Sequence, residues 1–187
     1  YGNFNEKNVT EKSICDPIGI YGALKFSGEK LVIAYNQVFD LPYTIIRPSA
    51  LYGERCISRR VGQIFIENAI QNKPIVIDGD GRDKLDFTYI EDLIEGVYKA
   101  IISNNSKNEI FNITHGNGRS IKELINVLKK NFTNIDVKNK ERDKLMPERG
   151  TLSIEKAKKL IDYNPVWNLE KGYQRYIDWY KNFSKNS

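Results

Sequence analysis

The spacing of apolar residues divides the first part of the chain into helical and extended segments. Apolar residues recur at helical intervals over 18–39 and again over 61–72, so they share one helix face in each segment. Between them, the β-branched and aromatic run "YTIIRP" at 43–48 predicts a strand, and the segment from Asp40 to Pro42 stops the helix that precedes it. We therefore expect a helix, a strand and a second helix, in that order.

The segment "KPIVIDGDGRDKLDFTYI" at 73–90 holds two short apolar runs on either side of a Gly-Asp-Gly turn. Glycine readily adopts the positive φ that tight turns require. A tight turn between two strands favours antiparallel pairing. The pattern therefore predicts a β-hairpin over 73–90.

Helices and strands continue to alternate in the second half. The run "EDLIEGVYKAIIS" at 91–103 begins with two acids, which suit the positive end of a helix dipole, and continues with helical spacing. The run "EIFNIT" at 109–114 predicts a strand. Ser120 stands three residues before Glu123, a capping-box spacing, so we expect a helix from Ile121.

Two further helices are expected near the end of the chain. The first, within 151–165, has only a partial start signal, because Ser153 is followed at the third position by Lys156 rather than by an acid. The second, over 168–183, is amphipathic and rich in aromatic residues, which are typical of a core rather than of a ligand cage. Its aromatic residues are Tyr173, Tyr176, Trp179, Tyr180 and Phe183.

Strands that alternate with helices indicate an α/β fold with parallel strand pairs. The chain has 187 residues, of which 40% are hydrophobic and 28% charged, enough for one domain or for one domain and part of another. Its apolar runs are far shorter than the ~20 residues that span a bilayer, and no leader pattern opens it, so we expect a cytoplasmic protein without a membrane partner.

Metal and nucleic-acid binding are not expected. Cys15, Cys56 and the single histidine, His115, lack the spacing of metal ligands, so both cysteines are predicted to be free thiols. The net charge of +5 is compatible with an anionic partner such as nucleic acid or a diphosphate. The lysines alternate with glutamates and form no basic block, which argues against nucleic acid.

Tyr21 and Lys25 are the main candidates for chemistry. They stand four residues apart, so their side chains share one helix face. A nearby ammonium favours the phenolate form of a tyrosine, which makes the pair a plausible proton-transfer unit. The alternative is an ordinary amphipathic tyrosine with a buried ring and a solvated hydroxyl. Small residues around Tyr21, such as Gly22 and Gly28, would let another backbone or a cofactor approach this face.

Five segments, in order and spacing, resemble the NAD-dependent epimerase/dehydratase family of extended short-chain dehydrogenases over Asp16 to Phe183. They are "IYGALKFSGEKL", "LPYTIIRPSALYGER", "KPIVIDGDGRDKLDFTYIEDLIEGV", "EIFNITHGNGRSIKEL" and "RGTLSIEKAKKLIDYNPVWNLEKGYQRYIDWY". The resemblance implies the C-terminal part of a Rossmann-like parallel sheet plus a small α/β substrate-binding domain. Residues 1–60 would be the remainder of the NAD-binding domain, and 61–187 mainly the substrate-binding domain, with about 86–113 returning to the Rossmann sheet.

The resemblance also implies that part of the catalytic unit is missing from this sequence. The glycine-rich turn that receives the NAD pyrophosphate in the family is absent, and so is the serine or threonine that would precede "YG" at Tyr1. We therefore expect a truncated chain that is inactive alone. The complete protein would be a homodimer, because the family's Tyr-Lys helix packs in a four-helix interface.

Site residues follow from the resemblance position by position. Tyr21 would be the catalytic acid/base, and Lys25 would hold the nicotinamide ribose of NAD, with NADP as the alternative cofactor. The "RPSALYG" segment would line the nicotinamide and the sugar, although a plain strand end and turn explains it equally well. Its predicted cofactor contacts are Pro48, Ser49 and Ala50, and the predicted substrate contacts of the chain are Tyr52, Arg59, Arg82, Lys84 and Arg149.

Leu85 departs from the family pattern, which has an arginine before the Asp-Phe pair. Arg149 would reach the nucleotide diphosphate, because a guanidinium binds phosphate in a bidentate manner. The cations that could compensate for Leu85 are Arg55, Arg59, Arg60, Arg82 and Lys84. Asp86 and Asp92 are expected to be structural, and Glu54, in place of a common proline, has no assigned role.

The predicted function is therefore that of an NAD-dependent sugar-nucleotide epimerase of the 4-epimerase type. The transient oxidation product would be a keto sugar. The alternatives are a sugar-nucleotide dehydratase or reductase of the same family, a reductase for a substrate without a nucleotide, and a binding remnant without activity. The sequence leaves the sugar and the nucleotide open.

Overall fold

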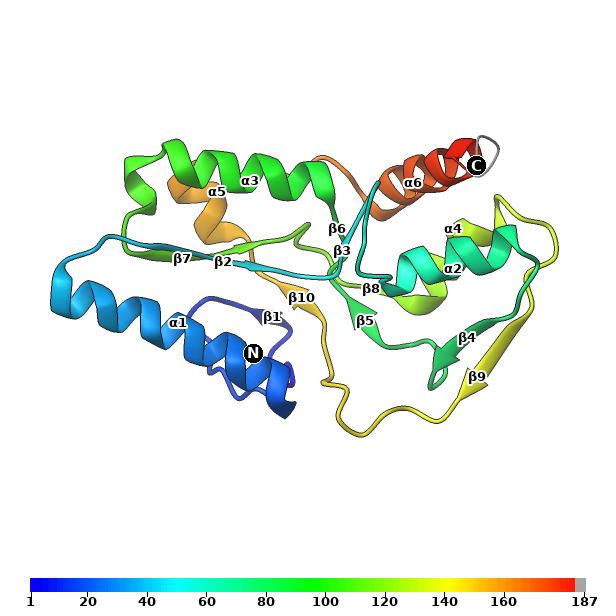
Figure 1. The fold of residues 1–187 in the computed structure, drawn as a ribbon, viewed down its shortest axis with the longest axis horizontal. Coiled ribbons are helices and arrows are strands. Elements are labelled where there is room, and N and C mark those ends of the chain that lie inside the picture. The colour runs from blue at the N-terminus through cyan, green and yellow to red at the C-terminus, as the bar shows by residue number, and fades with distance from the viewer. Residues whose placement is uncertain (184–187) are drawn as a thin grey trace.

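Parallel strand pairs joined by helices run through the chain, and the computed structural model describes residues 1–183 (Figure 1). Each strand pairs with a single partner, and four of the five pairs are parallel. The predicted α/β class is confirmed. In chain order the elements are β1 (Asn8–Val9), α1 (Gly19–Phe39), β2 (Thr44–Pro48), β3 (Leu51–Tyr52), α2 (Val61–Ile70), β4 (Ile75–Asp78), β5 (Lys84–Leu85), β6 (Thr88–Tyr89), α3 (Ile90–Ile102), η1 (Asn104–Ser106), β7 (Glu109–Ile113), β8 (Arg119–Ser120), α4 (Ile121–Lys129), β9 (Val137–Lys140), β10 (Thr151–Leu152), α5 (Glu155–Ile161) and α6 (Leu169–Phe183).

The longest strand pair, β2 with β7, organises one half of the molecule. Its register runs from Thr44 opposite Glu109 to Pro48 opposite Ile113. In Figure 1, α3 and α5 lie on one side of this pair and α1 on the other. The buried residues between the pair and α3 and α5 form a separate core cluster, of which Phe111, Ile113, Ala157 and Tyr163 are fully buried. Residues of α5 belong to this cluster, although the sequence analysis placed α5 in the segment 61–187, which it expected to form mainly the substrate-binding domain.

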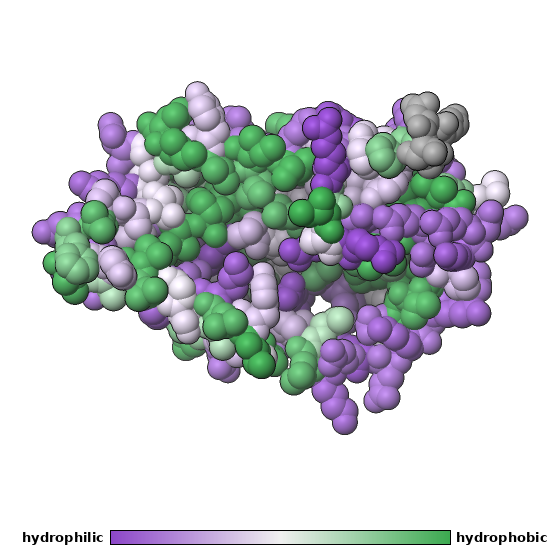
Figure 2. Space-filling model, in the orientation of Figure 1, coloured by the Kyte–Doolittle hydropathy of each residue, from purple (hydrophilic) through white to green (hydrophobic). Residues whose placement is uncertain are grey.

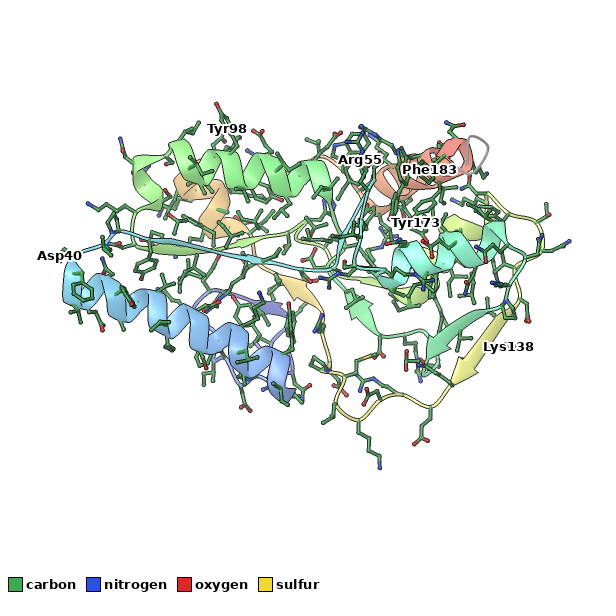
Figure 3. All side chains as sticks on the ribbon, viewed as in Figure 1. Asp40, Arg55, Tyr98, Lys138, Tyr173 and Phe183 are labelled. Atoms are coloured by element: carbon green, nitrogen blue, oxygen red, sulfur yellow. The ribbon has the colours of Figure 1, made fainter. Side chains whose placement is uncertain are left out.

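The other half is a lobe in which α2, α4 and α6 pack together beside the β4–β9 pair (Figure 1). Its core is larger and strongly aromatic. Tyr173, labelled in Figure 3, is fully buried, and its hydroxyl donates to the carbonyl of Gly62 at 2.8 Å. A Cβ at Gly62 would lie 3.3 Å from the Tyr173 ring, so a larger residue here would press on that ring. The predicted burial of the aromatic residues of α6 is confirmed for Tyr173 and Tyr176.

The predicted hairpin over 73–90 is wrong. Gly79 and Gly81 do adopt positive φ, so the turn itself forms. The flanking strands nevertheless pair elsewhere: β4 pairs in parallel with β9, and β5 pairs antiparallel with β8. The reason is tertiary, since pairing with β9 extends over four residues and keeps Ile75 and Ile77 buried against the core of the lobe.

The predicted capping box at the start of α4 is confirmed. The Ser120 hydroxyl accepts from the Glu123 amide at 3.2 Å, and the Glu123 carboxylate accepts from the Ser120 amide at 2.7 Å. By contrast, α1 begins at Ile18 with no side-chain cap and no acid in its first turn. Local sequence signals therefore define the start of α4 but not that of α1.

Both aspartates expected to be structural tie loops to the fold. Asp86 is fully buried and accepts hydrogen bonds from the Thr114 hydroxyl and from the amides of Gly116 and Leu152, each at 3.1 Å. Burial raises the pKa of Asp86 against the opposing effect of these donors. Asp92 stands in the first turn of α3, but its carboxylate accepts from amides outside that helix, at Val166 and Trp167.

Two helices carry apolar residues on the surface. None of the 21 residues of α1 is buried, and its exposed side chains include Leu24, Leu31 and Val38. On α3, Ile94 and Ile101 are likewise exposed. Figure 2 shows apolar side chains gathered over both helices. Within residues 1–183, no helix has the length and apolar character needed to span a membrane.

Candidate active site

A pocket of about 260 Å³ opens in the lobe, between the first turns of α2, the strand β4 and the segment that follows β9. Its walls are mainly apolar, with Val61 and Phe65 from α2, Ile77 from β4 and Leu85 from β5. The volume lies below the ~300–1,000 Å³ typical of small-molecule sites, so the pocket suits one end of an elongated ligand.

Two carboxylates at the pocket are already paired with cations. Asp78 lies 3.1 Å from the Lys140 ammonium, and Asp83 accepts from Nε of Arg142 at 3.0 Å. The Nη2 atom of Arg142 is buried without a hydrogen-bond partner in the described chain. The sequence analysis missed Arg142, which stands in a charged run without a recognisable motif. A ligand oxygen is the kind of partner that this nitrogen lacks.

Arg149 contributes an unpaired cation to the pocket. Within residues 1–183 it has no hydrogen bond or ion pair, and it lines the same cavity as Leu85. Desolvation by the surrounding protein lowers its pKa, and the positive charge of Arg60 lowers it further, whereas Tyr21 has the opposite effect.

The Tyr-Lys pair stands in the first two turns of α1, on its exposed surface. The Lys25 ammonium lies 5.8 Å from the centre of the Tyr21 ring, and Tyr21 as a residue is 71% exposed. A Cβ on Gly22 would come within 2.9 Å of the Pro17 side chain, so this glycine lets the preceding loop pack on the helix. Gly28, in contrast, faces open space. The helix therefore presents an accessible phenol beside an ammonium.

The residues predicted to contact the cofactor lie where β2 ends. Pro48 is the last residue of β2, and Ala50 adopts a φ of 37° in the turn before β3. The carboxyl ends of parallel strands in open α/β sheets are the usual place for ligands. This position is compatible with the predicted contacts at Pro48, Ser49 and Ala50.

The predicted substrate residues separate into two groups. Lys84 and Arg149 line the pocket. Arg59 and Arg82 do not, because Arg59 pairs with Glu67 at 3.0 Å and Arg82 pairs with Asp80.

Tyr52 also lies away from the pocket. It is 5% exposed and packs among aromatic rings, with its ring centroid 5.6 Å from that of Tyr89 and 6.1 Å from that of Tyr173. Its hydroxyl is buried and has no hydrogen-bond partner among residues 1–183. The structure therefore places Tyr52 in the core of the lobe. The sequence pattern could not show that Tyr52 is a core residue, because a tyrosine near a strand end can lie either in a core or in a ligand site.

Glu54, which had no assigned role, anchors α6. Its carboxylate accepts from the Tyr89 hydroxyl at 2.7 Å and pairs with Nε of Arg175 at 3.2 Å. The Arg175 guanidinium also stacks over Trp167, 5.0 Å from the ring centroid. This cluster is structural, and it attaches α6 to the loop after β3.

The sequence model of the family described as "NAD dependent epimerase/dehydratase family" matches residues 1–114. The chain belongs to this family. It is 34% identical to a putative UDP-glucose 4-epimerase of Methanocaldococcus jannaschii, over 97% of this chain and 60% of that protein. The chain thus spans about three-fifths of the length of this relative, and 54% of that of a second one, the uncharacterized UDP-glucose epimerase YtcB of Bacillus subtilis.

Solved structures of epimerases match the fold closely. The crystal structure of UDP-glucuronic acid 4-epimerase from Bacillus cereus, in complex with UDP-glucuronic acid and NAD, matches with a TM-score of 0.93 and 30% identity. The match covers 98% of this chain and 59% of the Bacillus cereus chain. UDP-glucose 4-epimerase from Thermotoga maritima, with UDP-glucose, matches with a TM-score of 0.91 and 26% identity over 98% and 60% of the two chains. The Rossmann-like architecture expected of an NAD-dependent epimerase/dehydratase is therefore confirmed.

Within residues 1–183, no group of three or more histidine, cysteine, aspartate or glutamate side chains could hold a metal ion. The described chain presents an accessible phenol at Tyr21, an ammonium at Lys25 and an unpaired guanidinium at Arg149.

Proposed function

We propose that the complete protein containing this chain is an NAD-dependent sugar-nucleotide 4-epimerase, and that this chain supplies its proton-transfer residue and its nucleotide pocket. One observation supports the proposal: an apolar pocket is lined by an unpaired arginine, Arg149. A nucleotide sugar likewise combines a flat base with an anionic diphosphate. Relatives that share at least 30% identity with this chain bear the name of UDP-sugar epimerases.

The residues present fit part of an NAD site. Lys25 and Tyr21 present an ammonium and a phenol on the open face of α1, and both can donate to ribose hydroxyls. Pro48, Ser49 and Ala50 stand at the end of β2, within the family's cofactor segment. The glycine-rich turn that would receive the pyrophosphate is not in this sequence. When bound, NAD would supply the reversible hydride acceptance that epimerisation at a sugar carbon requires.

Tyr21 would handle the proton. Its phenolate oxygen takes the proton of the sugar hydroxyl when that carbon is oxidised and returns it when the carbon is reduced from the other face. The Lys25 ammonium, on the same helix face, stabilises the phenolate during this cycle. The helix holds the two groups in a fixed relation, because residues four apart are neighbours on its surface.

The nucleotide would lie across the pocket with its base in the apolar part. Val61, Phe65 and Leu85 form walls suited to a flat ring. The paired carboxylates Asp78 and Asp83 provide acceptors for ribose hydroxyls. Arg149 would then bind the diphosphate, and Lys84 adds positive charge at the same cavity.

The decisive experiment is a turnover assay of the full-length protein with NAD and a panel of UDP-, GDP-, dTDP- and CDP-sugars. Loss of the phenol in Tyr21→Phe should lower kcat about 10²- to 10⁴-fold, the usual effect of removing a general acid/base. Tyr35→Phe is the matched control, since Tyr35 is an exposed tyrosine of the same helix and should leave kcat unchanged.

The products distinguish the remaining alternatives. A C4 epimer supports the proposal, whereas a 4-keto-6-deoxy sugar identifies a dehydratase. Reduction of a simple ketone without any turnover of sugar nucleotides would instead favour a substrate that lacks the nucleotide. A protein that binds NAD and UDP but converts nothing would be a binding remnant.

We also propose that the complete protein is a homodimer. The support is the apolar, unburied surface of α1, where Leu24, Leu31 and Val38 are exposed. Sedimentation of the full-length protein tests this, and Leu31→Lys should shift a dimer towards monomer. A monomeric wild-type protein would contradict it.

A further inference from the structure

A glutamate follows the Tyr-Lys pair on α1 at the same interval. Tyr21, Lys25 and Glu29 are spaced four residues apart, so each lies beside the next on the helix surface. A lysine and a glutamate at this interval can form an ion pair. Such a pair would neutralise the ammonium that stabilises the phenolate of the acid/base residue.

The structure pairs Glu29 with a different cation. Both of its carboxylate oxygens accept from Arg47 of β2, one from Nη2 at 2.6 Å and the other from Nε at 2.9 Å. The Lys25 ammonium has no hydrogen bond or ion pair within residues 1–183 and lies 5.8 Å from the centre of the Tyr21 ring. Glu29 is therefore held towards the sheet, and Lys25 keeps its full charge beside the phenol.

Arg47 is fixed in this arrangement by several neighbours. Its guanidinium lies 4.6 Å from the centre of the Tyr1 ring, and its Nη1 donates to the Glu11 carbonyl at 3.5 Å. The Tyr1 hydroxyl donates at 2.7 Å to Asn112, which stands opposite Arg47 in the β2–β7 pair. The side chain of Arg47 is 12% exposed and that of Glu29 19%. A bidentate pair shielded from water is stronger than an exposed pair on a helix surface, so Glu29 stays with Arg47.

We propose that Arg47 is a positioning residue: by holding both oxygens of Glu29, it keeps the Lys25 ammonium available to the phenol on the same helix. The inference rests on the proposed function, in which Tyr21 is the acid/base residue. Without Arg47, the Glu29 carboxylate would be released beside Lys25. The ammonium would then be partly neutralised, and the phenolate would be less stable.

Other titratable groups close to this network are common to all the variants compared below. They come from the first segment of the chain and from the segment after β9, and they are Tyr1, Glu11, Cys15, Asp16 and Arg149. Because these groups are retained throughout, a difference between variants reports on Arg47, Glu29 and Lys25.

The test is an ultraviolet titration of the Tyr21 phenol in the full-length protein. Subtracting the curve of the matching Tyr21→Phe protein from that of each variant removes the signal of all other tyrosines. Arg47→Gln should raise the Tyr21 midpoint by about 0.5 pH unit, the size expected when one nearby, solvent-screened charge is partly neutralised. Glu29→Gln breaks the same ion pair but leaves no carboxylate to neutralise Lys25, so the midpoint should not rise. A purely structural role of the ion pair predicts the same shift in both variants.

Further variants test the route through Lys25. The shift should vanish when Glu29→Gln is added to Arg47→Gln. In a Lys25→Gln background, Arg47→Gln should cause no shift, because the charge that Glu29 would neutralise is gone. Arg47→Lys lacks the planar fork and should give a smaller shift, which keeps the test open if Arg47→Gln does not fold. Lys159→Gln, at an exposed lysine of α5, is the charge-matched control and should leave the midpoint unchanged.

The titration separates this inference from the proposed function, because it needs no turnover. An unchanged midpoint in Arg47→Gln, equal shifts in Arg47→Gln and Glu29→Gln, or a shift that persists without Lys25 would each overturn the inference. A wild-type protein that converts no sugar nucleotide would overturn the proposed function instead. In an active enzyme, the midpoint of the pH–kcat profile should move in Arg47→Gln in the same direction as the titration.

Discussion

The lobe of α2, α4 and α6 and the helix α1 bury their apolar residues in opposite ways. The lobe encloses its own core, in which Ile66, Leu128 and Tyr173 are fully buried. In α1, a longer helix, no residue is buried, and apolar side chains such as Leu31 remain exposed. Within the described chain, the lobe is therefore stabilised by fully buried apolar side chains, whereas α1 contributes none.

Polar contacts connect α1 to the rest of the structure. Glu29 forms a two-point ion pair with Arg47 of β2, with Nη2 to Oε2 at 2.6 Å and Nε to Oε1 at 2.9 Å. Near the other end, the Asn36 amide donates to the Leu41 carbonyl at 3.0 Å and to Asn108 at 3.3 Å. These directional contacts help to position the helix that carries the proposed acid/base residue. The pocket, in contrast, is part of a packed core.

The largest difference is expected from truncating one leucine in each region. Leu128→Ala should reduce the free energy of unfolding by about 2–5 kcal/mol, because it leaves a cavity in the lobe. Leu31→Ala, at a side chain that is 60% exposed, should change it by less than about 0.5 kcal/mol. Urea denaturation of both variants gives the comparison. Equal losses would show that α1 is packed as firmly as the lobe.

A smaller effect is expected when the ion pair of α1 is broken. Glu29→Gln should cost about 1–3 kcal/mol, because it leaves the half-buried Arg47 guanidinium without its charged partner. The loss should appear as faster amide hydrogen exchange in α1 and unchanged exchange in α4 and α6. Lys158→Gln, at an exposed pair on α5, is the control, and its effect should be within about 0.5 kcal/mol. Uniform acceleration across the chain would mean that α1 and the lobe unfold together.

The smallest effect concerns the two helix starts. Ser120→Ala should cost about 1 kcal/mol, because α4 loses its cap, whereas Ile18→Ala should cost nothing measurable in α1.

The cap also predicts a pH dependence. The Ser120 amide, and then Arg119, lower the pKa of Glu123, so its contribution to stability is complete above its unfolded pKa and is lost as pH falls through the folded value. The stability difference between wild type and Glu123→Gln should therefore disappear on acidification. A constant difference would contradict the cap.

Much of the architecture follows from local patterns in the sequence. The helical spacing over 18–39, the strand at 43–48 and the capping box at Ser120 all correspond to observed elements. The four-residue spacing of Tyr21 and Lys25 places them on one helix face wherever that helix lies. These features depend on neighbouring residues, and the backbone geometry of a helix or strand is sufficient to produce them.

Only the tertiary structure decided which distant residues meet. The turn at 79–81 forms as its glycines require, but β4 pairs with β9 because the core of the lobe offers it a longer parallel partner. Arg59 and Arg60 are adjacent and alike in sequence, yet Glu67 of α2 pairs with Arg59, whereas Arg60 donates to the Ser58 hydroxyl. Strand pairing, ion pairing and side-chain burial depend on residues far apart in the sequence, so a local sequence pattern does not predict them.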